Sequence, residues 1–158
     1  MIAYQPIGII HSPFRDQEGM PIQPAGAPGI PGWIDLNGDF TAGLKNLAGF
    51  SHIILLYHFH LSDGYDLELQ PFLDDVRRGL FATRAPRRPN PIGLSVVKLT
   101  GVAGNIIEIE NVDVVDGTPL LDIKPYIPAF DSIAAATSGW VQGKEEGVRH
   151  MRSDDRFV

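Results

Sequence analysis

Proline and glycine are spread so densely through this chain that they limit the structures it can form. The 158 residues include 13 prolines and 17 glycines, and few stretches long enough for a helix are free of both. Proline removes a backbone donor and clashes with the preceding helical turn, and glycine costs about 1 kcal/mol in a helix interior. Residues 19–32 contain four prolines and are expected to form a long loop. The sequence therefore favours short strands joined by turns.

Short apolar runs bounded by turn residues predict an all-β protein, either a barrel or a sandwich, with about seven strands. Residues 51–60 form the clearest strand. Period-two geometry places Ile53, Leu55, Tyr57 and Phe59 on one face and the histidines of this run on the other. A short helix is predicted over 41–48. The strands are expected at 7–10, 33–36, 51–60, 79–82, 92–102, 106–115 and 120–123.

The length of the chain fits one domain, since domains average roughly 150 residues. Apolar content falls from Thr137 onward. We therefore expect a domain at residues 1–136 and a short C-terminal tail at 137–158. Trp140 is the only large anchor in that tail.

The absence of cysteine removes several classes of function at once. Disulfides, cysteine-ligated zinc, iron–sulfur clusters and thiol nucleophiles are all excluded. No apolar run approaches the ~18 residues of a membrane span, and the N-terminus lacks the basic region of a signal peptide. We expect a cytoplasmic protein with no membrane partner.

Common catalytic motifs are also absent. The glycines at 26, 29 and 32 alternate with prolines and precede no helix, so a Rossmann dinucleotide site is excluded. Neither a P-loop nor a Gly-x-Ser-x-Gly elbow is present. His58 and His60 share a strand face and suggest a metal-dependent hydrolase, but only five histidines exist and no second cluster supplies ligands. We expect no metal, with the two histidines at the edge of a pocket instead.

Basic charge is concentrated in one segment of an acidic protein. The net charge is −6, yet five of the 13 basic residues lie between positions 77 and 88, and all five are arginine. Arginine is suited to forked recognition of phosphate and carboxylate. Composition alone also fits a solvated basic loop. A local anion-binding site formed by these arginines is the more specific hypothesis.

Several segments along residues 3–133 form an ordered set of motifs: Ile7–Phe14, Phe50–Ile53, Phe81–Arg84, Arg88–Gly93, and Asp116–Pro119 together with Asp122–Tyr126. In this order they resemble the successive signatures of the TsaA-like (TrmO) family. The resemblance implies a single small β-barrel with one or two short helices and long loops. It also implies S-adenosyl-L-methionine as cofactor, a homodimer, and methylation of N6 of threonylcarbamoyl-adenosine beside the anticodon of a threonine tRNA.

The same resemblance implies which residues bind the cofactor. Two positions depart from the family pattern: Ile22 stands in place of an arginine and Leu61 in place of a glutamine. Asp116 or Tyr126 is expected to orient the amine that accepts the methyl group. The cofactor-binding residues implied are Pro21, Ile22, Gln23, His60, Leu61, Arg84, Leu94, Gly117, Thr118, Pro119 and Leu120.

The tRNA partner is expected to meet the arginine segment at Arg77, Arg78, Arg87 and Arg88. In the alternative, Arg87 and Arg88 are structural and pair with Asp74, Asp75 or the carboxylates of a partner protomer. Two other functions remain open, namely a non-enzymatic adenosylmethionine- or RNA-binding module and the metal-dependent hydrolase. The homodimer is expected to cover apolar residues of the long loops: Met20, Ile30, Leu67, Leu69 and Phe72.

Overall fold

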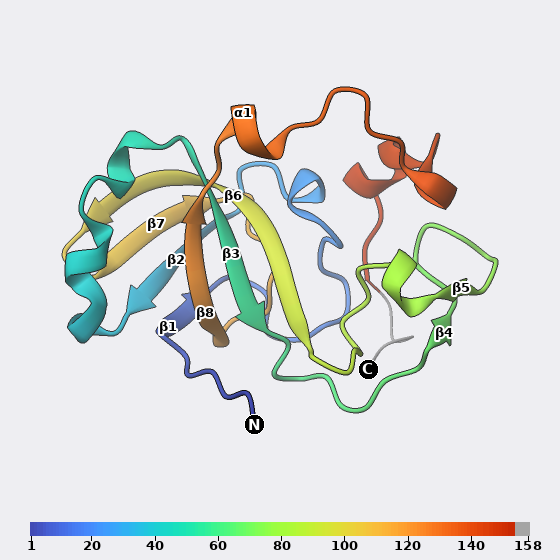
Figure 1. Ribbon diagram of the computed structural model, residues 1–158, viewed down its shortest axis with the longest axis horizontal. Helices are drawn as coiled ribbons and strands as arrows, with labels where there is room; N and C mark the ends of the chain where they lie inside the picture. Colours follow the sequence, from blue (N-terminus) through green and yellow to red (C-terminus); the bar gives the residue numbers. More distant parts are fainter. Residues whose placement is uncertain (154–158) are drawn as a thin grey trace.

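The computed structural model describes residues 1–153, and within them six strands close into an antiparallel barrel (Figure 1). The order around the barrel is β1-β2-β7-β6-β3-β8. The predicted all-β fold is confirmed as a barrel rather than a sandwich. The strands are β1 (Gly8–His11), β2 (Pro31–Leu36), β3 (His52–His58), β6 (Ile92–Ala103), β7 (Ile106–Glu110) and β8 (Thr118–Pro125).

Alternating apolar residues fill the barrel. Ile53, Leu55 and Tyr57 of β3 are buried, as the period-two pattern predicts. They pack with Ile34 of β2 and Ile107 of β7 in one cluster. Prolines stand first in β2 and last in β8, where a missing backbone donor is tolerated.

The predicted helix at 41–48 is wrong. Two 3₁₀ helices, η2 (Gly38–Leu44) and η3 (Leu47–Gly49), occupy the region. Between them Asn46 has φ of 68°, which no continuous right-handed helix allows. The predicted strand at 79–82 is also wrong: a two-stranded hairpin of β4 (Glu68–Leu69) and β5 (Arg78–Gly79) leads into the 3₁₀ helix η4 (Leu80–Ala82).

A layer of long connections lies beside the barrel. Figure 1 shows the green hairpin of β4 and β5 next to the red C-terminal part of the chain. We call residues 17–27, 59–91 and 137–153 together the loop layer. Besides β4, β5 and η4, its short elements are η1 (Pro24–Gly26), η5 (Gly139–Val141) and η6 (Glu145–Arg149), while α1 (Pro128–Asp131) connects it to the barrel.

The C-terminal segment, residues 137–153, folds back onto the rest of the loop layer. The backbone N–H of Ser153 donates to Met20 O at 2.8 Å, and that of Gly19 donates to Ser153 O at 2.7 Å. A Cβ at Gly26 would lie 2.6 Å from Val148 O, so glycine is what permits this close approach. The predicted boundary at 136 stays a prediction, and residues 154–158 of the predicted tail lie outside the described residues.

The apolar loop residues expected to need a dimer partner are mostly covered within one chain. Met20 is 9% exposed and Leu69 is 6% exposed, so the expectation that they are exposed is wrong. Leu69 packs with Leu80, Ala85 and Phe72 in a small second core. Leu67 remains exposed. In the described part of the chain, no helix has the length and apolar character needed to cross a bilayer.

Candidate functional site

A cavity of about 790 Å³ lies where one end of the barrel meets the loop layer. The end of β3 and the start of β6 form one wall, with Tyr57 and Gly93 among the lining residues. Residues 113–115 and Thr118, at the entry to β8, form another. All three parts of the loop layer complete it, including Trp140 from the C-terminal segment. Segments distant in sequence therefore share one concave site.

Most residues implied for cofactor binding line this cavity. They come from five separate stretches of the sequence, and nothing in their spacing required them to meet. Ile22 and Leu61, the two departures from the family pattern, are among them and make the wall less polar. The cavity-lining members of the set are Pro21, Ile22, Gln23, His60, Leu61, Arg84, Leu94 and Thr118.

The remaining members of that set lie outside the cavity lining. Leu120 is fully buried in the barrel core, because alternation along β8 turns its side chain inward. Gly117 and Pro119 flank the lining residue Thr118 without lining the cavity themselves.

Asp116 and Tyr126, the two candidates for orienting the amine, lie at opposite ends of β8. Tyr126 donates its backbone N–H to His52 O, at the start of β3, whereas the cavity is at the end of β3. Eight strand residues at roughly 3.3 Å each separate the two positions. Tyr126 thus lies far from the cavity and Asp116 lies next to the lining residue Val115, and which of the two orients the amine stays a prediction.

Asp116 is held beside the cavity by hydrogen bonds with His11, the last residue of β1, and with Ser12, the residue after β1. Its Oδ1 accepts from Ser12 N at 3.1 Å and lies 3.0 Å from His11 Nδ1. Partial burial raises its pKa, but the hydrogen bonds from Ser12 and His11 outweigh burial and hold the pKa below its ordinary value. His11 in turn stacks on Trp33 at 4.8 Å between ring centroids.

The polar edge of the cavity is an arginine–glutamine pair. Arg84 Nη1 donates to Gln23 Oε1 at 2.8 Å, joining positions 61 residues apart in the chain. Both side chains line the cavity, so each orients the other toward the same space. This pair can offer both donors and an acceptor to a polar ligand.

Within residues 1–153, Arg87 and Arg88 contact other groups than Asp74 and Asp75, the partners expected if both arginines are structural. Arg87 donates to Asp63 O at 3.0 Å and pairs with Asp66 at 3.4 Å. Arg88 donates to Thr83 O at 3.0 Å and Ala85 O at 3.2 Å, and lines the cavity. The expected pairing of either arginine with Asp74 or Asp75 is absent among the residues described.

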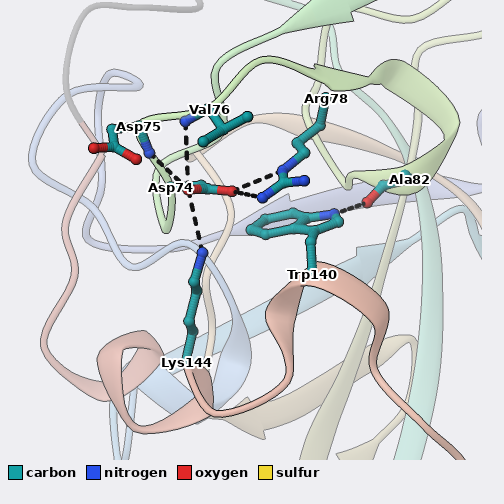
Figure 2. Close-up of polar contacts among 7 residues, drawn as sticks. All are labelled: Asp74, Asp75, Val76, Arg78, Ala82, Trp140 and Lys144. Atoms are coloured by element: carbon teal, nitrogen blue, oxygen red, sulfur yellow. Dashed lines mark hydrogen bonds and ion pairs between the residues drawn. The ribbon is translucent and has the colours of Figure 1, made fainter.

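Asp74 instead holds Arg78 and the C-terminal segment together, in an arrangement we call the Asp74 clasp (Figure 2). Arg78 donates to Asp74 Oδ2 through two nitrogens, and Lys144 Nζ lies 3.2 Å from Oδ1. These cations and the backbone N–H groups of Asp75 and Val76 hold the pKa of Asp74 well below its ordinary value. Arg78 is thus committed to an internal contact.

Trp140 extends the clasp. Its Nε1 donates to Ala82 O at 2.7 Å. The guanidinium of Arg78 lies 5.6 Å and the ammonium of Lys144 5.5 Å from its ring centroid. Figure 2 shows the ring directly beside the Arg78 guanidinium. Trp140 thus anchors the C-terminal segment as expected, and its partners are Ala82, Arg78 and Lys144.

A buried polar chain behind the cavity wall was not predicted from the sequence. Tyr57 OH and Ser95 Oγ lie 2.8 Å apart, and Ser95 Oγ donates to Asp113 Oδ1 at 2.6 Å. Asp113 is 7% exposed and lines the cavity. Burial raises its pKa to about 7 and also raises the pKa of Tyr57. The available signal was a lone carboxylate inside the apolar run 112–115.

The two histidines of the hydrolase hypothesis do not converge on a metal site. His60 lines the cavity, and burial, followed by repulsion from His58, lowers its pKa. His58 is exposed at the strand end. Across residues 1–153, no three histidine or acidic side chains are grouped closely enough to hold a metal ion. The geometry gives the hydrolase no support.

Comparison with known proteins identifies the family. The model of the tRNA-methyltransferase O N-terminal domain matches residues 9–132. The chain belongs to the TrmO family. It is 49% identical to a "probable S-adenosyl-L-methionine-binding protein" of Pyrococcus abyssi, over 99% of this chain and 85% of that one. It is 34% identical to the tRNA (adenine(37)-N6)-methyltransferase of Escherichia coli, over 88% of this chain and 63% of that enzyme.

Solved structures of the TrmO family share the barrel. A crystal structure of TrmO from Pseudomonas aeruginosa aligns with a TM-score of 0.75 at 38% identity, covering 89% of this chain and 62% of that one. A second TrmO crystal structure aligns with a TM-score of 0.76 at 40% identity, covering 88% and 64%. The chain thus spans less than two thirds of both solved chains and of the Escherichia coli enzyme. The resemblance in sequence and the expected fold are both confirmed.

Proposed function

We propose that this protein uses S-adenosyl-L-methionine to methylate N6 of a tRNA adenosine next to the anticodon, with threonylcarbamoyl-adenosine as the specific substrate. The observation that carries the proposal is the convergence of eight family cofactor positions on one cavity. Relatives from Escherichia coli and Mus musculus are named tRNA (adenine(37)-N6)-methyltransferases, which supports the reaction class.

The residues present suit the cofactor. A volume of about 790 Å³ falls within the ~300–1,000 Å³ of typical ligand pockets. Phe59, Leu61 and Leu94 offer apolar surface for an adenine face and for the methylene carbons of the ligand's amino-acid chain. Arg84 and Gln23 can bind the carboxylate and hydroxyl groups of the ligand. The buried carboxyl of Asp113 lies in the same wall.

Methyl transfer requires mainly that the acceptor nitrogen be aligned with the methyl–sulfur bond. When bound, the cofactor would supply a methyl group on a positively charged sulfur; the methyl group would pass to N6, the sulfur would keep the electron pair of the broken bond, and the N6 proton would leave to solvent. The chain's residues would bind and orient the two reactants for this exchange. Asp116, held by Ser12 and His11 beside Thr118, is our candidate for orienting the acceptor amine.

The tRNA is proposed to approach across Arg87 and Arg88. Arg88 borders the cavity, and Arg87 lies on the adjacent loop with its ion pair to the exposed side chain of Asp66. An exposed ion pair contributes little stability, so phosphate can replace Asp66 at low cost. Arg77 is exposed as well, while Arg78 is held in the Asp74 clasp and is the weakest of the four candidates. We further propose that the protein is a homodimer located in the cytoplasm. Light scattering at micromolar concentration tests the dimer.

A second candidate is a cofactor-binding protein without methyltransferase activity. The archaeal relative matched over 99% of this chain is named only for S-adenosyl-L-methionine binding. The chain also spans only 63% of the Escherichia coli enzyme.

The experiment that separates these candidates has two stages. Calorimetry with S-adenosyl-L-methionine tests cofactor binding, and mass spectrometry of tRNA nucleosides from a deletion strain tests the reaction. Loss of the N6-methylated nucleoside, restored by the wild-type gene, is the expected result. Cofactor binding with an unchanged nucleoside profile would favour the second candidate. No binding at all would overturn both.

A further inference from the structure

Asp113 is an acidic group in the cavity wall that forms no ion pair within the described residues. Its Oδ1 accepts a hydrogen bond from the neutral hydroxyl of Ser95, and that hydroxyl is in contact with Tyr57 OH. Among residues 1–153, no lysine, arginine or histidine forms an ion pair with it. A buried carboxylate is costly unless it is paired, so this site favours the arrival of a positive charge.

The groups that face Asp113 come from three parts of the fold. Tyr57 of β3 and Ser95 of β6 are neutral hydroxyls, and burial raises the pKa of Tyr57 so that it remains protonated. Arg84 of the loop layer attracts the charged form of Asp113 at longer range, but its guanidinium is bonded to Gln23. His60 shares the cavity, and its lowered pKa keeps it neutral near pH 7. None of these groups supplies a full positive charge in contact with the carboxylate.

We propose that Asp113 binds a positive charge of S-adenosyl-L-methionine and is the residue that favours this cationic cofactor in the cavity. The inference rests on the proposed function, since it assumes the same cavity and the same cofactor. The cofactor carries two cations, the methyl-bearing sulfonium and the α-ammonium, and either one satisfies the chemistry of the site. A hydrogen bond or close contact to a charged group is worth about 1.5–3 kcal/mol, or roughly 10- to 150-fold in affinity.

This role couples cofactor binding to the charge of Asp113. Burial raises its pKa to about 7, so half of the free protein carries a neutral Asp113 near that pH. A bound cation favours the carboxylate and expels the proton. Affinity for the cofactor should therefore rise as pH increases from 6 to 8, and binding at pH 6 should release a proton to the buffer.

The test is calorimetry with S-adenosyl-L-methionine and with S-adenosylhomocysteine, which lacks the sulfonium charge. Asp113→Asn keeps the shape of the side chain and removes the charge. Asp122→Asn is the matched control, because Asp122 lies on β8 outside the cavity and pairs with Lys124. We expect Asp113→Asn to lose about 10-fold or more in affinity for the cofactor at pH 8, and Asp122→Asn to bind as the wild type.

S-adenosylhomocysteine, the product left after methyl transfer, distinguishes the two cations. If Asp113 faces the sulfonium, Asp113→Asn weakens S-adenosyl-L-methionine alone. If it faces the α-ammonium, both ligands weaken equally. Either result supports the proposal. Equal binding of both ligands by Asp113→Asn and wild type would overturn it and leave Asp113 as a partner for Ser95 only.

Two further measurements test whether the pH dependence of cofactor binding comes from Asp113. Wild-type protein titrated in buffers of different ionisation enthalpy reports proton release without any variant, and a pH-independent affinity with no proton release would overturn the proposal. His60→Gln should retain the pH dependence that Asp113→Asn loses. A wild type that binds no cofactor contradicts the proposed function itself, which separates that failure from a failure of Asp113.

Discussion

The barrel and the loop layer are stabilised in different ways. In the barrel, every strand pairs with two neighbours and the interior is filled by apolar side chains such as Ile34 and Ile107. The loop layer has a small apolar cluster around Leu80 and depends on polar contacts between distant segments. Its principal contacts are the Asp74 clasp, the Trp140 hydrogen bond to Ala82 and the pairing of Met20 with Ser153.

The cavity lies between these two regions and draws on both. The barrel contributes the rigid ends of β3 and β6, and the loop layer contributes the charged and aromatic groups. A stable scaffold can position reactive groups on loops that differ among relatives. The comparison therefore predicts that barrel substitutions change global stability, whereas loop-layer substitutions change binding and local order.

Ile107→Ala should produce the largest effect, because Ile107 is fully buried in the barrel core. Removing its branched side chain leaves a cavity and should cost about 2–5 kcal/mol in the free energy of unfolding. Urea denaturation followed by circular dichroism measures this change. Ile133→Ala, at a residue 71% exposed, is the control and should shift stability by less than about 0.5 kcal/mol. Similar losses in both variants would contradict the assignment of stability to the barrel.

Asp113→Asn should stabilise the protein without ligand at pH 8. Burial raises the pKa of Asp113 to about 7 from 3.8, so the folded state holds its proton more tightly than the unfolded state. Its contribution to stability is fully present below pH 3.8 and is lost as pH rises through about 7. The variant should exceed the wild type by on the order of 2–4 kcal/mol at pH 8 and match it near pH 4. A stability difference that does not grow with pH would argue against a buried charge.

Arg84→Ala should weaken cofactor binding by about 1.5–3 kcal/mol, with little change in the free energy of unfolding, because Arg84 borders the cavity and its hydrogen bond is to Gln23, which borders it too. Calorimetry measures the affinity and a thermal melt checks the fold. Arg149→Ala, at an exposed position outside the cavity lining, serves as control. Wild-type affinity in Arg84→Ala would remove this residue from the site.

Replacing Arg87 and Arg88 together with alanine should weaken tRNA binding and flatten its dependence on salt. Each phosphate contact on single-stranded RNA contributes about −0.7 to the log–log slope, so the change is at most ~1.4. Filter binding at several salt concentrations gives the slope. Cofactor affinity should change little by comparison. An unchanged slope with a lower melting temperature would assign both arginines to structure, through Asp63 and Asp66 for Arg87 and through Thr83 and Ala85 for Arg88.

Trp140→Phe should give the smallest and most local effect. The substitution keeps a ring but removes the hydrogen bond to Ala82, worth about 0.5–1.5 kcal/mol. Hydrogen exchange should increase in the C-terminal segment and remain unchanged in the barrel strands. Trp33→Phe, on β2, is the comparison and should leave the C-terminal segment protected. Faster exchange throughout the barrel would show that the two regions unfold as one unit.

The sequence predicted the barrel well, because strand alternation is a local property. Ile53, Leu55 and Tyr57 face inward as their spacing indicates. The helix at 41–48 failed because Asn46 adopts a left-handed conformation that apolar spacing does not reveal. Gly93 shows a constraint of another kind: a Cβ there would lie 2.2 Å from the Tyr57 ring, a contact known only once β3 and β6 are paired.

The site was predictable only in part. Family resemblance identified Gln23 and Arg84, which do meet. It did not identify Asp113 or Trp140, which also line the cavity. Pairings such as Asp74 with Lys144 join residues 70 positions apart through the fold of the loop layer, and charge composition cannot specify them.

The pairing of Ser153 with Met20 also bears on the order in which a growing chain can become functional. The barrel is complete once β8 has emerged at Pro125, because β8 closes it against β1 and β3. The cavity needs Trp140, Val148 and Ser153, which leave the ribosome later. Synthesis at about 5–20 residues per second therefore allows the barrel to form first. A nascent chain stalled between these points would be folded but would lack one wall of its cavity.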